Sequence, residues 1–244
     1  MAGVRIGTSG WQYRHWRGDF YPADLPSSHW LSSYVERFDT VELNASFYRL
    51  PRAEAFAAWG RRVPDGFRFA VKASRYLTHV KRLRDPAEPL ERFWSRVRRL
   101  GDRCGPVLYQ LPPHWRPDWE RLDAFLAAIP RGPWQAIEIR DPRWYGEELE
   151  RRLEAAGVTL CLHDMAGSAW SGEPIGPFAY LRFHGAGERY GGRYPDEVLR
   201  GWADRMAGWA RAGRPVWAYF NNDIGGHAPR DAVRLRAYVD ERLS

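Results

Sequence analysis

The chain has 244 residues, of which 44% are hydrophobic and 27% are charged, and its formal net charge is +7 at pH 7. This composition excludes a disordered chain, and no apolar run approaches the roughly 18 residues that a membrane helix needs. The length suits one β/α barrel of about 250 residues. We find no repeat, linker or low-complexity tract, so we expect residues 1–244 to form a single domain.

Eight β-prone segments alternate with helical periods along the chain. The strands are predicted at residues 4–8, 40–44, 68–72, 106–111, 136–140, 158–163, 179–184 and 216–221. Apolar residues three and four apart predict helices within residues 31–38, 90–100, 122–129, 198–209 and 235–243. Such alternation requires parallel strands with right-handed crossovers, and eight units favour an α/β fold, a single (β/α)8 TIM-type barrel. Residues 164–177 have no helical period, so we expect the barrel to be somewhat irregular between strands 6 and 7.

The expected helix ends carry residues that suit them. Ser28, Asp118 and Asp231 are predicted to cap helix starts, because their side-chain oxygens can accept free backbone N–H groups. Gly101, Gly157 and Gly213 each stand just before a strand, where a glycine can end a helix. The first strand begins at about residue 4 with no basic and apolar leader before it, so we expect a cytoplasmic protein. Cys104 and Cys161 lack metal-ligand spacing and are expected to be buried thiols, as in a reducing compartment.

Polar residues occupy alternate positions of the strands, where the barrel interior is expected. Because side chains alternate across a strand, residues two apart share one face. The predicted catalytic residues are Glu42, Lys72, Glu138 and Asp164. The predicted substrate-binding residues are Trp11, Asn44, Tyr48, Gln110, Arg140, Arg182, His184, Tyr219, Asn221 and Asn222. Glu42, Glu138 and Arg182 should lie one layer deeper than the rest, and an ion-pair network that only stabilises the barrel is an equal alternative for them.

The arginine content and two loops after the last strands favour an anionic partner. Arginine supplies nearly all of the positive charge, since Lys72 and Lys81 are the only lysines, and guanidinium groups bind phosphate and carboxylate bidentately. Arginines spread over a surface also serve simply to solvate it. Residues 184–194 and 221–227 follow the last two strands, where barrels often bind phosphate. Plain flexible turns are an equal alternative for both loops.

No cofactor is predicted. The glycines of residues 184–194 lack the dinucleotide spacing, which excludes a nicotinamide or flavin site there. Glu138, His163, Asp164 and His184 could ligate a metal, but no H-x-H, H-E-x-x-H or clustered cysteine supports one, so we predict no metal ion. Aromatic residues crowd residues 11–21, and we expect most of them to plug the top of the barrel, with Trp11 and Tyr48 left for a ligand.

Long motifs of the sequence resemble the YecE-like family, also called domain of unknown function 72. They are GTSGW (residues 7–11), FYP (20–22), TVELNASFYRLP (40–51), FAVKAS (69–74), QLPP (110–113), YLRFHG (180–185) and YFNND (219–223). The resemblance implies a TIM-type barrel without an established reaction, and a likeness to endonuclease-IV-type barrels implies phosphate or nucleic-acid handling. The family's motif positions fall mostly on the inward residues named above. Where the family often has a histidine after Arg140, this chain has Asp141-Pro-Arg-Trp.

The leading hypothesis is an enzyme that acts on a phosphorylated or otherwise anionic substrate at the C-terminal mouth of the barrel, such as a hydrolase of phosphate esters. A first alternative is a non-catalytic nucleic-acid-binding protein that uses the basic residues 74–84 and the rim aromatics. A second is a carbohydrate-active barrel with two carboxylates. The set of metal ligands that endonuclease-IV-type enzymes carry is missing, which argues against a trinuclear metal nuclease. We expect no membrane partner, and the oligomeric state is left open.

Overall fold

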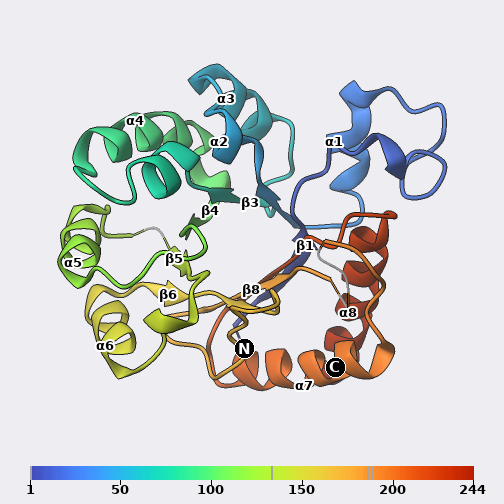
Figure 1. Ribbon diagram of the computed structural model, residues 1–244. Coiled ribbons are helices and arrows are strands. Elements are labelled where there is room, and N and C mark those ends of the chain that lie inside the picture. Colours follow the sequence, from blue (N-terminus) through green and yellow to red (C-terminus); the bar gives the residue numbers. More distant parts are fainter. Residues whose placement is uncertain (1, 133, 186, 188–189) are drawn as a thin grey trace.

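The protein is described here from a computed structural model that covers residues 2–132, 134–185, 187 and 190–244. Its strands lie at the centre of a ring of helices (Figure 1). The strands are β1 (Val4–Thr8), β2 (Thr40–Leu43), β3 (Arg68–Lys72), β4 (Cys104–Gln110), β5 (Gln135–Glu138), β6 (Thr159–Leu160), β7 (Leu162–His163), β8 (Ala179–Phe183) and β9 (Val216–Phe220). They pair in parallel, in the orders β1-β9-β8-β7 and β2-β3-β4-β5-β6.

The two sheets adjoin each other at two places. Only Cys161 separates β6 from β7, which together occupy the predicted sixth strand. At the other place Ser9, just after β1, forms a parallel bridge with Glu42 of β2. The backbones approach so closely here that a Cβ on Gly7 would lie 2.3 Å from the carbonyl oxygen of Thr40. The fold is the predicted (β/α)8 TIM-type barrel, and residues 164–177 connect the predicted sixth and seventh strands without a helix, as expected.

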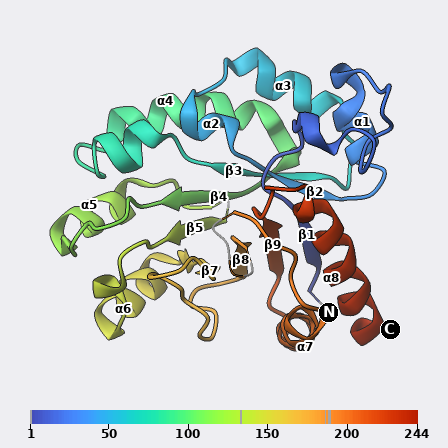
Figure 2. The same ribbon diagram turned by 45° about the vertical axis from the view of Figure 1, so that its right-hand side comes forward.

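The helices cover the outside of the strands (Figure 2). They are α1 (Trp30–Tyr34), α2 (Ala45–Tyr48), α3 (Ala53–Arg61), α4 (Ala87–Val97), α5 (Trp119–Ala128), α6 (Glu147–Ala156), α7 (Asp196–Arg211) and α8 (His227–Leu243). Short 3-10 turns lie at Arg14–Trp16, Ser27–His29, Arg98–Arg103 and Pro142–Trp144, and a π turn at Tyr76–Val80. None of the helices in the described ranges is long and apolar enough to cross a membrane.

Two of the three predicted helix caps are wrong. Asp118 does cap α5, because its side chain accepts the Arg121 N–H at 3.1 Å. Ser28 instead lies inside a 3-10 turn and makes no capping bond. Asp231 lies inside α8, which already begins at His227, and its carboxylate is fully buried. Gly157 ends α6 in the left-handed conformation, as predicted.

The alternation of strand side chains has the predicted consequence. Outward residues such as Val41 and Val71 pack with the helices in the main hydrophobic core. The inward residues form a separate apolar cluster, which consists of Ala70, Leu108, Ala136, Cys161, Phe178, Tyr180, Trp217 and Tyr219. Most of them stand two residues before a polar site residue, so the polar layer rests on an apolar plug. Cys161 is buried and Cys104 half-buried, and both are free thiols as predicted.

Candidate functional site

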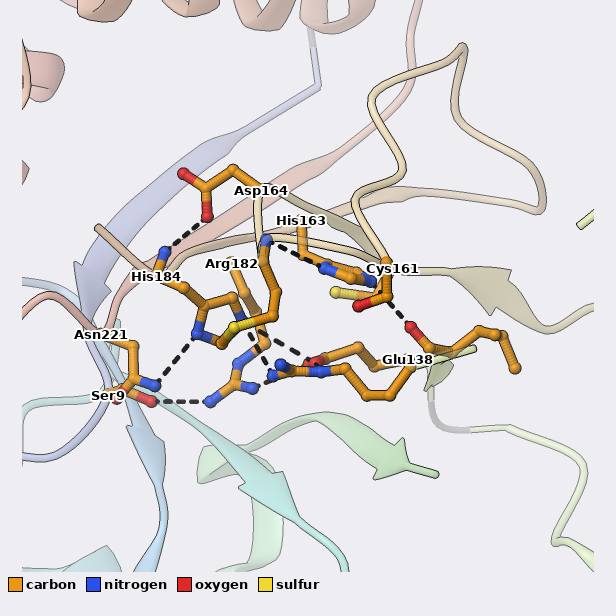
Figure 3. A network of polar contacts seen from close by, with 12 residues as sticks. Ser9, Glu138, Cys161, His163, Asp164, Arg182, His184 and Asn221 are labelled. Atoms are coloured by element: carbon orange, nitrogen blue, oxygen red, sulfur yellow. Dashed lines mark hydrogen bonds and ion pairs between the residues drawn. The ribbon is translucent and has the colours of Figure 1, made fainter. Parts of the chain in front are cut away.

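A cluster of paired charges lies directly above the apolar plug. We call it the ionic cluster, and its members are Glu42, Glu138, Arg140 and Arg182. Arg182 bridges the two carboxylates, since it donates to Glu42 at 2.8 Å and to Glu138 at 2.7 Å. Arg140 donates from Nε to the other oxygen of Glu138. Figure 3 shows the Arg182 guanidinium lying between Ser9 and Glu138.

Neighbouring hydroxyl groups complete the ionic cluster. Glu42 accepts hydrogen bonds from the Ser9 hydroxyl and, at 2.7 Å, from the Tyr180 hydroxyl. Burial opposes ionisation of Glu138, but Arg140 and Arg182 outweigh it and hold the pKa of this carboxyl well below its ordinary value. Burial likewise disfavours the charged Arg182, yet Glu42 and Glu138 raise its pKa. Two carboxylates therefore balance two guanidinium groups as fixed charges, which is the ion-pair network that the sequence left as an alternative.

The ionic cluster does not resemble the carboxylate pair of a glycosidase. Such a pair faces a substrate across open space, whereas here Arg182 occupies the space between Glu42 and Glu138. Both carboxylates are fully buried. The geometry therefore gives the carbohydrate alternative no support.

A cavity of about 250 Å³, which we call the mouth cavity, opens above the ionic cluster. It is lined by His15, Asn44, Tyr48, Lys72, Gln110, Arg182, Tyr190, Asn221, Asp223 and Ile224. Lys72 ends β3, and its Nζ lies 4.0 Å from the centre of the Phe47 ring. The structure therefore brings six of the predicted site residues to one cavity.

Lys72 differs from the arginines beneath it because no carboxylate of the described residues forms an ion pair with it. The residue is only 7% exposed. Within the described part of the chain, Nζ makes no hydrogen bond, and it lies over the face of the Phe47 ring as a cation–π contact. Burial and the nearby charge of Arg182 lower the pKa of Lys72 to about 7. A buried amine that is half protonated at neutral pH is a group poised for chemistry or for an anion.

Asp223 is a site residue that the sequence analysis did not select. It follows β9 and lines the mouth cavity together with Lys72. Its carboxylate accepts the Trp16 indole N–H at 2.7 Å and pairs with His15 at 2.9 Å. Burial raises the pKa of Asp223 to about 6, although both contacts oppose that rise. The signal was present in the sequence, because Asp223 closes the YFNND motif.

A second cavity, of about 410 Å³, lies beside the first and shares Gln110 with it. Arg140, Asp164 and His184 line it. Asp164 accepts the His184 backbone N–H at 2.7 Å and also the Tyr194 hydroxyl. Burial raises the pKa of Asp164, and these two hydrogen bonds only partly offset the rise. Asp164 thus stands at the mouth, where it was predicted, but beside a different cavity from Lys72.

Two neighbours fix the state of His184. Arg140 donates to its Nε2 at 3.1 Å, and the Asn221 side chain lies 3.2 Å from its Nδ1. A guanidinium can only donate, so Nε2 accepts from Arg140, and the atom of Asn221 that faces Nδ1 is its amide nitrogen. Burial lowers the pKa of His184 well below its ordinary value. His184 therefore holds Arg140 and Asn221 in place as a neutral ring.

Glu138, His163 and His184 lie close enough to share a metal ion, since one ligand atom of each lies within 4.8 Å of the others. The atoms are already used, however. Both oxygens of Glu138 accept from guanidinium groups, and Nε2 of His184 accepts from Arg140. His163 directs Nε2 at the Ile139 carbonyl oxygen, 2.8 Å away. Two guanidinium groups in the same place repel a divalent cation, so these residues do not fit a metal ion. The absence of a metal stays a prediction.

Three of the predicted substrate-binding residues do not reach either cavity. Trp11 packs against Trp59 and Phe69 in the core, with ring centres 5.7 and 6.3 Å away, because the first loop folds inward. Tyr219 belongs to the apolar plug, and its hydroxyl lies 2.7 Å from that of Thr40. Asn222 is fully buried and donates to Asp231 at 2.8 Å. The geometry therefore gives no support to the predicted contact of these three residues with a substrate.

In the two loops predicted to bind phosphate, several of the described backbone N–H groups form hydrogen bonds within the protein. Gly185 donates its N–H to the Tyr194 hydroxyl at 2.7 Å. In the other loop, Ile224 and Gly226 donate theirs to backbone carbonyl groups. Residues 186, 188 and 189 of the first loop lie outside the described residues. The described N–H groups named here are therefore used within the protein rather than directed at a ligand.

The fold and the site define a class: parallel β/α barrels with a polar cavity at the carboxyl ends of the strands. Within that class, the sequence matches the family described as "Protein of unknown function DUF72" over residues 5–244, and the chain belongs to this family. The predicted resemblance is confirmed. The family has no established reaction, and membership therefore assigns none to this chain.

Relatives and solved structures agree with this assignment. The UPF0759 protein YunF of Bacillus subtilis is 25% identical over 99% of this chain and 96% of its own length. The UPF0759 protein YecE of Escherichia coli is 31% identical over 140 residues, which are 55% of this chain and 52% of YecE. The crystal structure of a DUF72 family protein from Thermotoga maritima (TM1631) covers 97% of this chain and 99% of its own, with a TM-score of 0.88 and 28% identity. A D-psicose 3-epimerase (TM-score 0.56, 13% identity, 98% and 99% covered) shares the fold alone.

Proposed function

We propose that this protein is an enzyme that acts on a small phosphorylated or carboxylated substrate bound in the mouth cavity. The observation that carries the proposal is the position of Lys72, a cation at the cavity wall that no described carboxylate balances. The ionic cluster below is neutral in formal charge and Asp223 on the cavity wall is already paired with His15, so Lys72 is the cation that remains for an anion. An anion also favours the charged form of a lysine whose pKa lies near 7.

The other lining residues suit the same kind of substrate. Arg182 also borders the mouth cavity, and Asn44, Gln110 and Asn221 offer amide groups that orient a ligand without adding charge. The buried amide oxygen of Asn44 has no hydrogen-bond partner within the described residues, so a hydroxyl group of a substrate would satisfy it. Asp223, with a pKa near 6, is the proton donor or acceptor that we assign to the cavity.

Sulfate binding tests the anion site, because sulfate does not titrate near neutral pH. Calorimetry on the wild type should give an affinity that falls as the pH rises through about 7, where Lys72 loses its proton. Lys72→Met removes one charge-assisted hydrogen bond of about 1.5–3 kcal/mol, a loss of roughly 10- to 150-fold. Lys81→Arg is the matched control, since Lys81 pairs with Asp85 at 3.3 Å in another loop. Equal sulfate affinity in Lys72→Met and wild type would refute the site.

Turnover is tested by incubating the same proteins with a panel of small phosphorylated and carboxylated metabolites, followed by proton NMR. We expect the wild type and Lys81→Arg to convert at least one compound, and Lys72→Met to lose that conversion while keeping its melting temperature. Conversion at the same rate by Lys72→Met would show that the reaction does not depend on Lys72 and does not take place at the anion site of the mouth cavity. No conversion of any compound would count against an enzyme.

A second candidate, binding of single-stranded nucleic acid, is favoured by one feature of the rim. Tyr48 is 80% exposed and Tyr76 46% exposed, and bases stack on such rings. A basic hollow lined by His79, Val80, Lys81, Arg82, Arg84 and Arg121 lies on the same loop as Tyr76. The test is an oligonucleotide titration at several salt concentrations. Binding that weakens steeply with salt and is lost in Tyr48→Ala with Tyr76→Ala would support it, and no binding at low salt would eliminate it.

A further inference from the structure

We propose that Lys72 forms an imine with its substrate, so that the substrate carries an aldehyde or ketone group as well as an anionic group. This inference rests on the proposed function and narrows it to one class of compound. Such a reaction needs an amine that no described carboxylate pairs with, a protonation state that leaves this amine partly neutral, and an acid that lines the same cavity. Arg182, which also borders the cavity, supplies the positive charge that the anionic group would face.

The first part is the amine of Lys72. Arg140 and Arg182 are committed to carboxylates, whereas Nζ of Lys72 donates to no acceptor among the described residues. It lies over the face of Phe47 at 4.0 Å and borders the mouth cavity. An amine that has to break no ion pair is free to form a covalent bond. For binding an anion alone, a fixed charge such as arginine would serve better, and this chain uses arginine at nearly every other basic position.

The second part is the protonation state. A neutral amine is the nucleophile, and an ordinary lysine with a pKa of about 10.4 is neutral in roughly one molecule in 2,500 at pH 7. Burial and the charge of Arg182 bring the pKa of Lys72 to about 7, so that about half of the molecules carry the neutral amine. A lysine can be activated in this way by a neighbouring cation and by desolvation of its side chain.

The third part is Asp223, which lines the same cavity and has a pKa near 6. The Nζ lone pair forms a C–N bond with the carbonyl carbon, and one of the two Nζ protons passes to the carbonyl oxygen, which becomes a hydroxyl group. A proton from Asp223 lets that hydroxyl leave as water while nitrogen loses its own proton to the carboxylate. The net change is an amine and a carbonyl compound giving an imine and water, with no oxidant or reductant.

Because the chain has two lysines, Lys72 and Lys81, a reagent that labels amines can be assigned to one side chain. Wild-type protein is incubated with glycolaldehyde phosphate and sodium cyanoborohydride, which reduces an imine to a stable secondary amine, and peptide mass spectrometry locates the label. We expect labelling of Lys72 with half-maximal rate near pH 7. Neutral glycolaldehyde should label Lys72 at least about tenfold more slowly, because it lacks a charge-assisted contact with the site. Added sulfate should slow labelling by glycolaldehyde phosphate.

Matched variants separate this inference from the proposed function. Lys81→Arg should keep the label, and Lys72→Met should lose it while still melting like the wild type. Labelling of Lys81 or of the amino terminus at the same rate as Lys72, or a midpoint near pH 10, would overturn the imine. If sulfate binds through Lys72 but no label appears there, the anion site stands and the imine fails. If neither sulfate nor label reaches Lys72, the proposed function fails as well.

Discussion

Replacing Arg182 tests whether the ionic cluster is held together by this one side chain. Arg182→Met keeps much of the volume but removes a guanidinium that donates to Glu42, Glu138 and Ser9 at 2.8, 2.7 and 3.1 Å. Both carboxylates are fully buried, so water does not replace the lost donors. Removing one partner of a buried ion pair typically costs about 3–5 kcal/mol, because the other charge stays buried. Since two carboxylates lose a partner here, we expect the upper end of that range.

The loss should depend on pH with a defined sign. In the wild type the folded-state pKa of Glu138 is depressed, so its contribution is fully present above the unfolded pKa of about 4.3 and is lost as the pH falls. Without Arg182, only Arg140 and His184 remain to oppose the effect of burial, so the pKa of Glu138 rises relative to the wild type. The difference in unfolding free energy between wild type and Arg182→Met should therefore be largest near pH 7 and shrink towards pH 4.

Urea unfolding at pH 7 and pH 4.5 measures this difference, and calorimetry should show a melting temperature lower by about 6–20 °C at pH 7. Arg230→Met is the control. Arg230 is 58% exposed and pairs with Asp19 at 2.6 Å, and an exposed pair of this kind contributes about 0–1 kcal/mol. If Arg182→Met unfolds like Arg230→Met, or its deficit does not change with pH, the ionic cluster does not have the energetic role assigned to it.

Two further variants test how the barrel is built. Asp118→Ala should lower the unfolding free energy by about 1 kcal/mol in urea, because α5 loses its cap; the neighbouring Asp123→Ala, on the exposed side of α5, should cost less, and the reverse order would contradict the capping role. Gly7→Ala should cost about 1–3 kcal/mol, because the added methyl group meets the Thr40 carbonyl oxygen where β1 passes β2. If Gly7→Ala were as stable as the wild type, β1 and β2 could move apart at Gly7 without a cost in stability.

The barrel could be predicted from the sequence because its strands are short, regular and separated by periodic helices. The helices that escaped prediction lack that signal: α6 buries only Leu149 and Leu153, and the residues between them are charged or exposed. Asp231 was misread for a related reason. An aspartate before an apolar stripe suits a cap, but the Asp231 carboxylate accepts from the buried Asn222 side chain and from the backbone N–H of Tyr194, which lies much earlier in the chain. Pairings of this kind leave no local trace in a sequence.

Side-chain parity placed most of the candidate site, because alternation along a parallel strand decides which residues face inward. Side-chain alternation could not predict how far from the mouth of the barrel each inward residue lies. Tyr219 and Asn221 share one face of β9 and its extension, yet Tyr219 lies in the apolar plug and Asn221 at the mouth cavity. It also could not decide which charges pair. That Arg182 would bridge Glu42 and Glu138, and that Lys72 would be left without a carboxylate, depends on register between strands far apart in the sequence.

The pairing of β1 with β9 has a consequence for how the chain reaches its native state. Val4 is in register with Val216, so β1 completes its ladder only with β9, more than 200 residues later. The sheet from β2 to β6, by contrast, assembles from neighbours in sequence. Contacts of long sequence separation, such as those of β1 with β9, form late and slowly. We therefore expect the ladder of β1 to stay unformed until β9 has been made. A circular permutant that begins at β2 and joins the two native ends, which lie close together in both overall views, should fold faster.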